Sequence, residues 1–166
     1  SEGLILLTSD GEFAQQVAHP SFGVTKTYLV KLRGRVEGED IERLRRGVHL
    51  AEGRTGGAQL RVIKRSNQWT QMQVTLSEGR NREIRRIFAA VGYKVQTLKR
   101  VAIGNLTDRR LKPGQWRPLL RSEVRELMHA TEPEGSAPAR REARRPATQG
   151  RRFGKRAAQH WTALRS

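Results

Sequence analysis

The chain has 166 residues, of which 33 are Lys or Arg and 16 are Asp or Glu, and its formal net charge is +17. This length suits one domain with a core of its own, and the positive charge indicates a polyanionic partner, with nucleic acid as the first candidate. The absence of cysteine excludes disulfides and thiolate metal sites, and the four histidines are scattered without the spacing of metal ligands.

Up to residue 76, strand-like alternation and helix-like spacing follow one another along the chain. The elements predicted there, in chain order, are a strand over 3–8, a helix over 13–18, a strand over 25–33, a helix over 39–46, and strands over 48–50, 58–63 and 69–76. Within the strand over 25–33, the alternation places Lys26, Tyr28 and Val30 on one face. Gly47 is predicted to end the second helix.

A further helix is predicted after Gly79, where the spacing of the apolar residues changes. Its apolar stripe, at spacings of three and four residues, consists of Ile84, Ile87, Phe88 and Val91. We expect Asn81 to be the N-cap of this helix, and Gly92 to take the left-handed conformation at its C-terminal end.

Four arginines crowd the start of this predicted helix, namely Arg80, Arg82, Arg85 and Arg86. The free N–H groups of a helix start and the guanidinium groups together favour a phosphate or a carboxylate. Four cations beside the positive end of a helix dipole are unfavourable unless an anion neutralises them. The pattern therefore predicts a functional, anion-binding segment.

After this segment the predicted elements are a strand over 94–103 with a bulge, a short strand over 114–119, and a helix capped by Ser122. From residue 132 the composition shifts to Arg, Pro, Gly, Ala and Gln, with nine Lys or Arg against three Glu. Residues 132–166 are therefore predicted to be a basic disordered tail, either simply solvated or an electrostatic arm for RNA, and 1–131 the folded domain. Strands interleaved with helices, without regular βαβ spacing, favour an α+β domain over a doubly wound one.

Four stretches, in their order and spacing, carry a family resemblance: GLILLTSDGE, HPSFGVTKTYLV, LSEGRNREIRRIFAAVGYKVQTLKRVAIG and LKPGQWRPL. Together they span roughly residues 1–127 and resemble the bacterial ribosomal RNA pseudouridine synthases, in particular the subfamily for small- or large-subunit rRNA that normally carries an N-terminal S4-like domain. The resemblance implies a mixed, mainly antiparallel sheet with flanking helices. It also implies an enzyme that isomerises uridine in ribosomal RNA to pseudouridine without a metal, nucleotide or redox cofactor. We expect the protein to be a monomer. The basic C-terminal extension and the LKRVAIG stretch favour large-subunit rRNA.

The catalytic group of that family is an aspartate in an Arg-Leu-Asp motif, a few residues before a Ser/Thr-x-Gly-Leu strand start. This sequence opens at Ser1-Glu2-Gly3-Leu4, without an initiator Met, so we expect an N-terminally truncated catalytic domain whose aspartate lies just upstream of Ser1. The three aspartates present, Asp10, Asp40 and Asp108, fall in a turn, a helix start and a loop, and are poor substitutes. No signal peptide is visible, which favours the cytoplasm.

The resemblance also assigns roles around the missing aspartate. Arg85 matches the arginine that pairs with this carboxylate and lowers its pKa, although by itself it reads equally as a surface cation. Tyr28 matches the tyrosine that stacks on the flipped base, and its alternative is a place in the core. Ile84 is predicted to form the apolar wall of the same pocket, or plain core.

RNA contact is predicted for seven further residues, which are Lys26, Arg80, Asn81, Arg82, Arg86, Lys99 and Arg100. The leading hypothesis predicts that this polypeptide alone converts no uridine, and that restoring an upstream Arg-Leu-Asp segment gives activity that Arg85→Ala abolishes. The alternative is a non-catalytic RNA-binding or ribosome-associated module. A membrane-surface or DNA-binding protein is less favoured, because the sequence has no long apolar run and no groove-reading helix with dimer signals.

Overall fold

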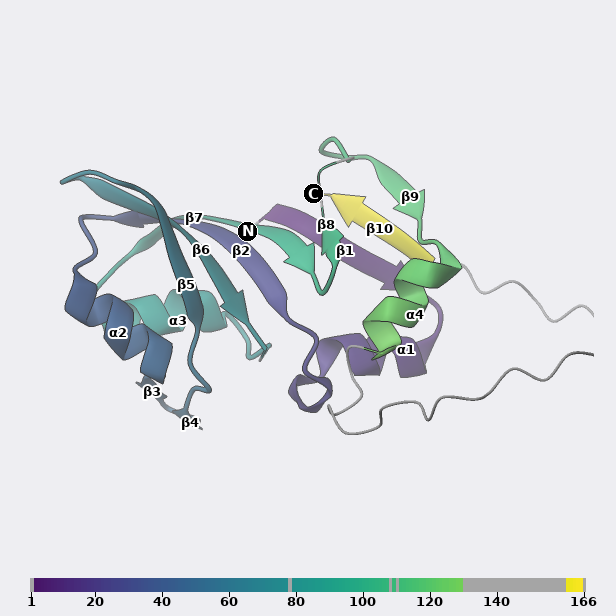
Figure 1. Cartoon of the computed structure of the whole chain (residues 1–166), viewed down its shortest axis with the longest axis horizontal. Coiled ribbons are helices and arrows are strands. Elements are labelled where there is room, and N and C mark those ends of the chain that lie inside the picture. The colour runs from purple at the N-terminus through teal and green to yellow at the C-terminus, as the bar shows by residue number, and fades with distance from the viewer. Residues whose placement is uncertain (1, 78, 108, 110, 130–160, 166) are drawn as a thin grey trace, which may run out of the picture.

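A sheet of eight strands runs through the part of the chain that the computed structural model describes, which is residues 2–77, 79–107, 109, 111–129 and 161–165 (Figure 1). Neighbouring strands follow the order β5-β6-β2-β7-β1-β10-β9, and β8 pairs with β7. The strands are β1 (Glu2–Thr8), β2 (Lys26–Arg33), β5 (Gln59–Arg65), β6 (Trp69–Leu76), β7 (Val95–Ile103), β8 (Leu106–Thr107), β9 (Trp116–Pro118) and β10 (Trp161–Arg165). A separate hairpin consists of β3 (His49–Leu50) and β4 (Gly53–Arg54).

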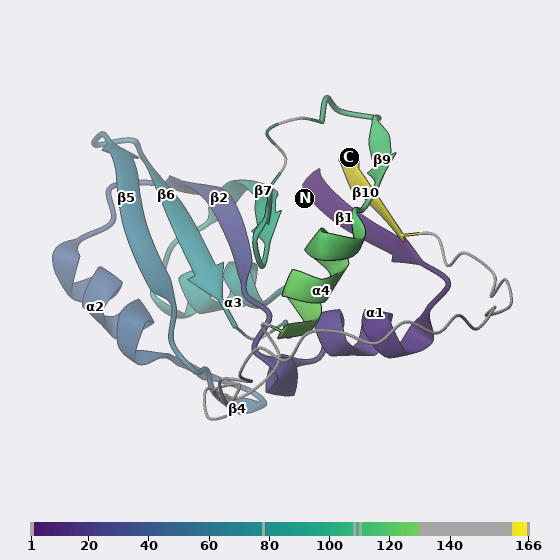
Figure 2. The same cartoon turned by 45° about the vertical axis from the view of Figure 1, so that its right-hand side comes forward.

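Helices cover the two halves of this sheet separately. They are α1 (Gly11–Ala18), the single-turn η1 (Pro20–Phe22), α2 (Gly38–Arg46), α3 (Glu83–Ala90) and α4 (Arg121–His129). α2 and α3 lie along β5, β6, β2 and β7, whereas α1 and α4 lie beside β1, β10 and β9 (Figure 1 and Figure 2). The predicted α+β class, with a mixed and mainly antiparallel sheet, is confirmed.

Each half has its own hydrophobic core. The alternation predicted along β2 and β6 is confirmed, because the first core buries Val30, Leu32, Met72 and Val74 together with Phe88 of α3. The second core, under α1 and α4, is built mainly from Leu4, Phe13, Val24, Ile103 and Leu127. The two cores are separate clusters, and the two halves of the sheet meet at a junction between them.

The two halves meet where β1 runs parallel to β7. This pairing is short, with Glu2 opposite Lys99 and Gly3 opposite Arg100. Gly3 has a φ of 114°, and a Cβ built there would lie 2.1 Å from the backbone oxygen of Arg100. Arg100 Nε also donates to Leu4 O at 2.6 Å. Only a residue without a side chain fits this junction, so Gly3 sets how closely the halves approach.

The bulge predicted for the strand over 94–103 is confirmed. The register between β2 and β7 shifts between Thr27 and Tyr28, and again between Lys31 and Leu32. Each shift leaves one extra residue on β7, which bends the strand and increases its twist. β7 can therefore pair with β2 along its length and with β1 at a different angle.

The N-cap prediction for α3 is wrong, whereas the prediction for its C-terminal end is confirmed. Arg82, with a φ of 50°, stands at the N-cap without a side-chain hydrogen bond, and Asn81 precedes it. At the other end Gly92 has a φ of 86°, and its N–H donates to Ala89 O at 3.0 Å. Ser122 is likewise inside α4 rather than capping it, because Glu123 Oε2 accepts from Leu120 N at 2.8 Å and closes that helix start.

Within the segment 132–166, predicted to be a disordered tail, residues 161–165 form a strand. β10 pairs antiparallel with β1, from Leu4 opposite Arg165 to Thr8 opposite Trp161, and its other edge pairs with β9. The composition argument considered only burial of apolar side chains, whereas an added strand is also held by main-chain hydrogen bonds to two neighbours. Residues 130–160 lie outside the described residues.

Candidate active site

A cavity of about 490 Å³ opens where the two halves of the sheet meet. The N-terminal end of β1, the start of β2, the end of β6, the middle of β7 and the segment that leads into α3 all contribute to it. Its charged lining residues are Glu2, Lys26, Arg80, Arg82, Glu83 and Arg100. Residues far apart in the sequence thus form one concave, mainly cationic surface.

Tyr28 and Ile84 combine the two roles predicted for them. Tyr28 lines the cavity and also packs, half-buried, against the first core. Ile84 is 4% exposed, belongs to that core and forms part of the cavity wall. The core therefore fixes the position of the aromatic ring and of the apolar wall before any ligand arrives.

Lys26 is the most unusual cation in the cavity. Its side chain is only 6% exposed, and its Nζ has no hydrogen-bond partner among the described residues. Burial lowers the pKa of Lys26 from its ordinary value of 10.5, the charge of Arg100 lowers it further, and the Glu83 carboxylate opposes both effects. A buried ammonium without a bonded acceptor is costly, and an anionic ligand in the cavity would relieve that cost.

The pH dependence of stability provides a test of this arrangement. Folding lowers the pKa of Lys26. Between this lowered pKa and 10.5, the unfolded chain therefore binds more protons than the folded chain. Lys26 thus makes the free energy of unfolding rise with pH across that window. The unfolding free energy of the unaltered chain minus that of Lys26→Met is expected to rise as the pH increases toward 10.5. Urea unfolding at a series of pH values measures it.

Lys64→Met, which removes an exposed lysine of β5, controls for the loss of one positive charge. A Lys26 difference that stays flat or falls with pH would contradict the buried cation.

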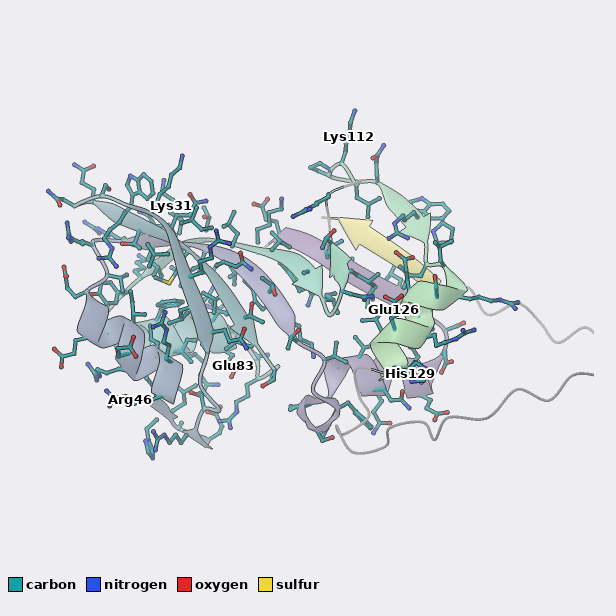
Figure 3. All side chains as sticks on the ribbon, in the orientation of Figure 1. Lys31, Arg46, Glu83, Lys112, Glu126 and His129 are labelled. Carbon is teal, nitrogen blue, oxygen red and sulfur yellow. The ribbon has the colours of Figure 1, made fainter. Side chains whose placement is uncertain are left out.

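Glu83 is a cavity residue that the sequence reasoning missed. It is 4% exposed, lines the cavity close to Lys26, and its Oε2 accepts from Arg80 N at 3.1 Å. Figure 3 shows Glu83 in the half built from β5, β6, β2 and β7, on the side that faces the other half. The only sequence signal was its position at the start of the predicted helix, where a carboxylate suits the helix dipole.

The four arginines of the predicted anion-binding segment are divided between two surroundings. Arg80 and Arg82 line the cavity, whereas Arg85 and Arg86 do not. Arg85 Nη1 donates to Val95 O at 3.1 Å, and Arg86 donates to the Glu52 carboxylate. The fold itself therefore supplies acceptors for part of this cluster, and one of them, Glu52, is an anion.

The remaining predicted RNA contacts and the aspartates lie at various distances from the cavity. Arg100 lines the cavity, while Lys99 and Asn81 are not among its lining residues. Asp10 caps α1 by accepting from Phe13 N at 3.1 Å, and Asp40 accepts from Tyr93 Oη at 2.8 Å. Neither aspartate lines the cavity, and Asp108 lies outside the described residues.

Two further properties of the described residues bear on function. None of the helices in the described part of the chain is long and apolar enough to cross a bilayer. Within the same described residues, no three His, Asp or Glu side chains lie together as a metal site requires.

Comparison with known proteins shows the family. A family model described as RNA pseudouridylate synthase matches residues 1–90. A relative from Aquifex aeolicus (strain VF5), named an uncharacterized RNA pseudouridine synthase, is 35% identical over 130 residues, or 78% of this chain and 52% of the relative. The ribosomal large subunit pseudouridine synthase B of Bacillus subtilis (strain 168) is 40% identical over 129 residues, or 76% of this chain and 53% of that protein.

A crystal structure of a pseudouridylate synthase matches the fold with a TM-score of 0.65 and 34% sequence identity, over 71% of this chain and 51% of the other. The chain spans about half the length of these relatives. The family model covers more than half of the 166 residues and includes the cavity residues of β1, β2 and the segment before α3. The resemblance seen in the sequence is thus confirmed, and the chain belongs to the RNA pseudouridylate synthase family.

Proposed function

We propose that the chain is the greater part of the catalytic domain of an enzyme that isomerises uridine in ribosomal RNA, more specifically in the large subunit, to pseudouridine. The observation that carries the proposal is the cavity between the two halves. Its lining combines the Tyr28 ring and the Ile84 side chain with several cationic side chains. Its volume of about 490 Å³ falls within the roughly 300–1,000 Å³ range of small-molecule sites. One flipped nucleotide fits such a space.

The chemistry requires a site that holds a base outside its helix. Tyr28 offers the aromatic face that replaces lost stacking, worth about 1–3 kcal/mol per base. Arg80, Arg82 and Arg100 suit the phosphates on either side of the nucleotide. In the reaction the bond from C1′ to N1 breaks and a bond from C1′ to C5 forms, while N1 gains a proton and C5 loses one, so no oxidant or reductant is needed.

The nucleophilic aspartate is proposed to enter from upstream of Ser1. Glu2 lines the cavity, and consecutive Cα atoms are about 3.8 Å apart, so an aspartate a few residues before Ser1 is within reach of the cavity. Arg85, which donates to the Val95 carbonyl and does not line the cavity in this structure, is proposed to turn from that carbonyl to this carboxylate, because a charge-assisted bond is stronger than one to a neutral carbonyl. The cation would keep the aspartate ionised.

A second function, that of a non-catalytic RNA-binding module, has one observation in its favour. None of the aspartates in the described residues lines the cavity. A map of pseudouridines in both ribosomal RNAs, from a strain that lacks the gene, separates the two functions. We expect one or a few uridines of the large-subunit rRNA to stay unmodified, and the intact gene to restore them. An unchanged map would overturn the enzymatic proposal. A substrate in ribosomal RNA would place the protein in the cytoplasm.

A further inference from the structure

A second concave surface lies outside the candidate active site. It has a volume of about 440 Å³ and is formed by the C-terminal end of α2, the β3–β4 hairpin and the end of α3. Three arginines and a histidine line it, namely Arg43, Arg46, His49 and Arg54, and none of its described lining residues is acidic. Figure 3 shows Arg46 at the end of α2, next to the hairpin. We call this surface the arginine concavity.

The backbone around the arginine concavity is held tightly in place. A Cβ at Gly47 would lie 2.2 Å from Thr55 O, and a Cβ at Gly57 would lie 2.3 Å from Arg45 O, so both positions need glycine. Thr55, which is buried, exchanges bonds with Val48: its N–H donates to Val48 O at 2.9 Å, and its Oγ1 accepts from Val48 N at 3.0 Å. The concavity is therefore pre-formed, which lowers the entropic cost of binding.

The acidic groups nearby neutralise only part of its positive charge. Arg43 pairs with Asp40 at 3.4 Å, in an exposed ion pair of little energetic weight. Arg54 Nη2 donates to Arg46 O at 3.1 Å and so satisfies a carbonyl at the end of α2, which leaves its other donors available. For the exposed Arg46 guanidinium, the described residues provide no bonded acceptor. Cations at a helix C-terminus interact favourably with its dipole, but that effect does not require three guanidinium groups around one concavity.

The hairpin connects the arginine concavity with the active-site cavity. Arg80, which lines the cavity, donates to Gly53 O at 3.4 Å and to Arg54 O at 3.2 Å. Arg54 in turn lines the arginine concavity. Arg86 fastens the same hairpin through Glu52. A basic surface therefore runs from the cavity across β4 to the end of α2.

We propose that the arginine concavity binds the phosphates of the RNA strand that flanks the target nucleotide. This inference rests on the proposed function. Planar guanidinium forks suit phosphate oxygens, and the lining holds three of them with no Phe, Tyr or Trp and with Val48 as its largest apolar side chain, so it suits phosphates better than a base or a small organic ligand. A strand whose nucleotide occupies the cavity can continue over the hairpin, where backbone phosphates meet arginines regardless of base sequence.

The salt dependence of RNA binding tests the proposal. The probe is large-subunit rRNA transcribed in vitro, and the unaltered chain is compared with the double variant Arg46→Gln/Arg54→Gln. The slope of log affinity against log salt is expected to become shallower by about 0.7–0.9 for each phosphate that the variant no longer neutralises. The matched control is Lys64→Gln/Arg65→Gln, which removes the same charge from the end of β5 remote from the hairpin; its slope should change less.

A second variant guards against misfolding. Arg46→Glu leaves the backbone carbonyl that Arg54 binds intact, and it is expected to weaken binding more than the neutral change. In an active extended form of the chain, the double variant should raise KM with little change in kcat.

A slope equal to that of the β5 control, or a fall in kcat at unchanged KM, overturns the arginine concavity as a binding site and leaves the proposed function intact. Failure of the unaltered chain to bind the rRNA overturns both.

Discussion

Replacing Gly3 by alanine is expected to lower the free energy of unfolding by about 2–6 kcal/mol. A side chain at a φ of 114° costs about 1–3 kcal/mol, and forcing atoms into a packed site costs about 1–3 kcal/mol more. The atom that the new Cβ would meet, 2.1 Å away, is a backbone oxygen of Arg100, which cannot rotate aside. The added side chain would push β1 and β7 apart at their junction. Because the cavity is lined by both strands, its shape should change as well.

Urea unfolding followed by circular dichroism measures this effect, and RNA affinity measured on the same samples reports on the cavity. Gly11→Ala is the matched control, because nothing lies within 4 Å of a Cβ there and Gly11 begins α1, where alanine is favourable. Equal stabilities for Gly3→Ala and Gly11→Ala would show that the close approach of β1 to β7 does not hold the halves together.

Replacing Arg85 by alanine is expected to lower turnover by about 10²–10⁴-fold in a form of the chain that carries the upstream aspartate. Breaking a buried ion pair costs about 3–5 kcal/mol, and each 1.36 kcal/mol is about tenfold in rate. Folding should change little, because Arg85 contributes one hydrogen bond, to Val95 O, worth roughly 1 kcal/mol. Without the cation the pKa of the aspartate rises, so the acid limb of the pH–activity profile should move to higher pH.

Arg86→Ala is the control for this experiment, since Arg86 is the next residue, carries the same charge and pairs with Glu52 outside the cavity. Single-turnover kinetics on rRNA compare the two variants, and Arg85→Lys should recover part of the loss. A loss of the same size for both alanine variants would mean that Arg85 acts only through general attraction to RNA.

Local patterns were sufficient for most of the fold. The alternation in β6 predicted its bounds without error, because one face of that strand packs on the first core and the other does not. Gly92 was predictable for a similar reason, since a left-handed residue at a helix end depends on its neighbours alone. The segment predicted to bind an anion was also visible as a local cluster of arginines, and two of them, Arg80 and Arg82, line the cavity.

What the sequence did not show depends on contacts between distant segments. β10 is defined by its pairing with β1, over 150 residues away in the chain, and no composition rule registers such a pairing. The burial of Lys26 next to Glu83 follows from the arrangement of β2 and α3 around the junction. The internal acceptors of Arg85 and Arg86 come from β7 and from the β3–β4 hairpin. Tertiary packing, rather than local propensity, decided each of these features.

The cavity at the β1–β7 junction is proposed to convert uridine once an aspartate is supplied from upstream of Ser1. The decisive experiment incubates unmodified large-subunit rRNA with the 166-residue chain and with the same chain extended by its upstream coding sequence, and measures pseudouridine by mass spectrometry. We expect pseudouridine from the extended chain only, and its loss when the upstream aspartate is changed to asparagine. Conversion by the unextended chain, or RNA binding without conversion by the extended one, would contradict the proposal.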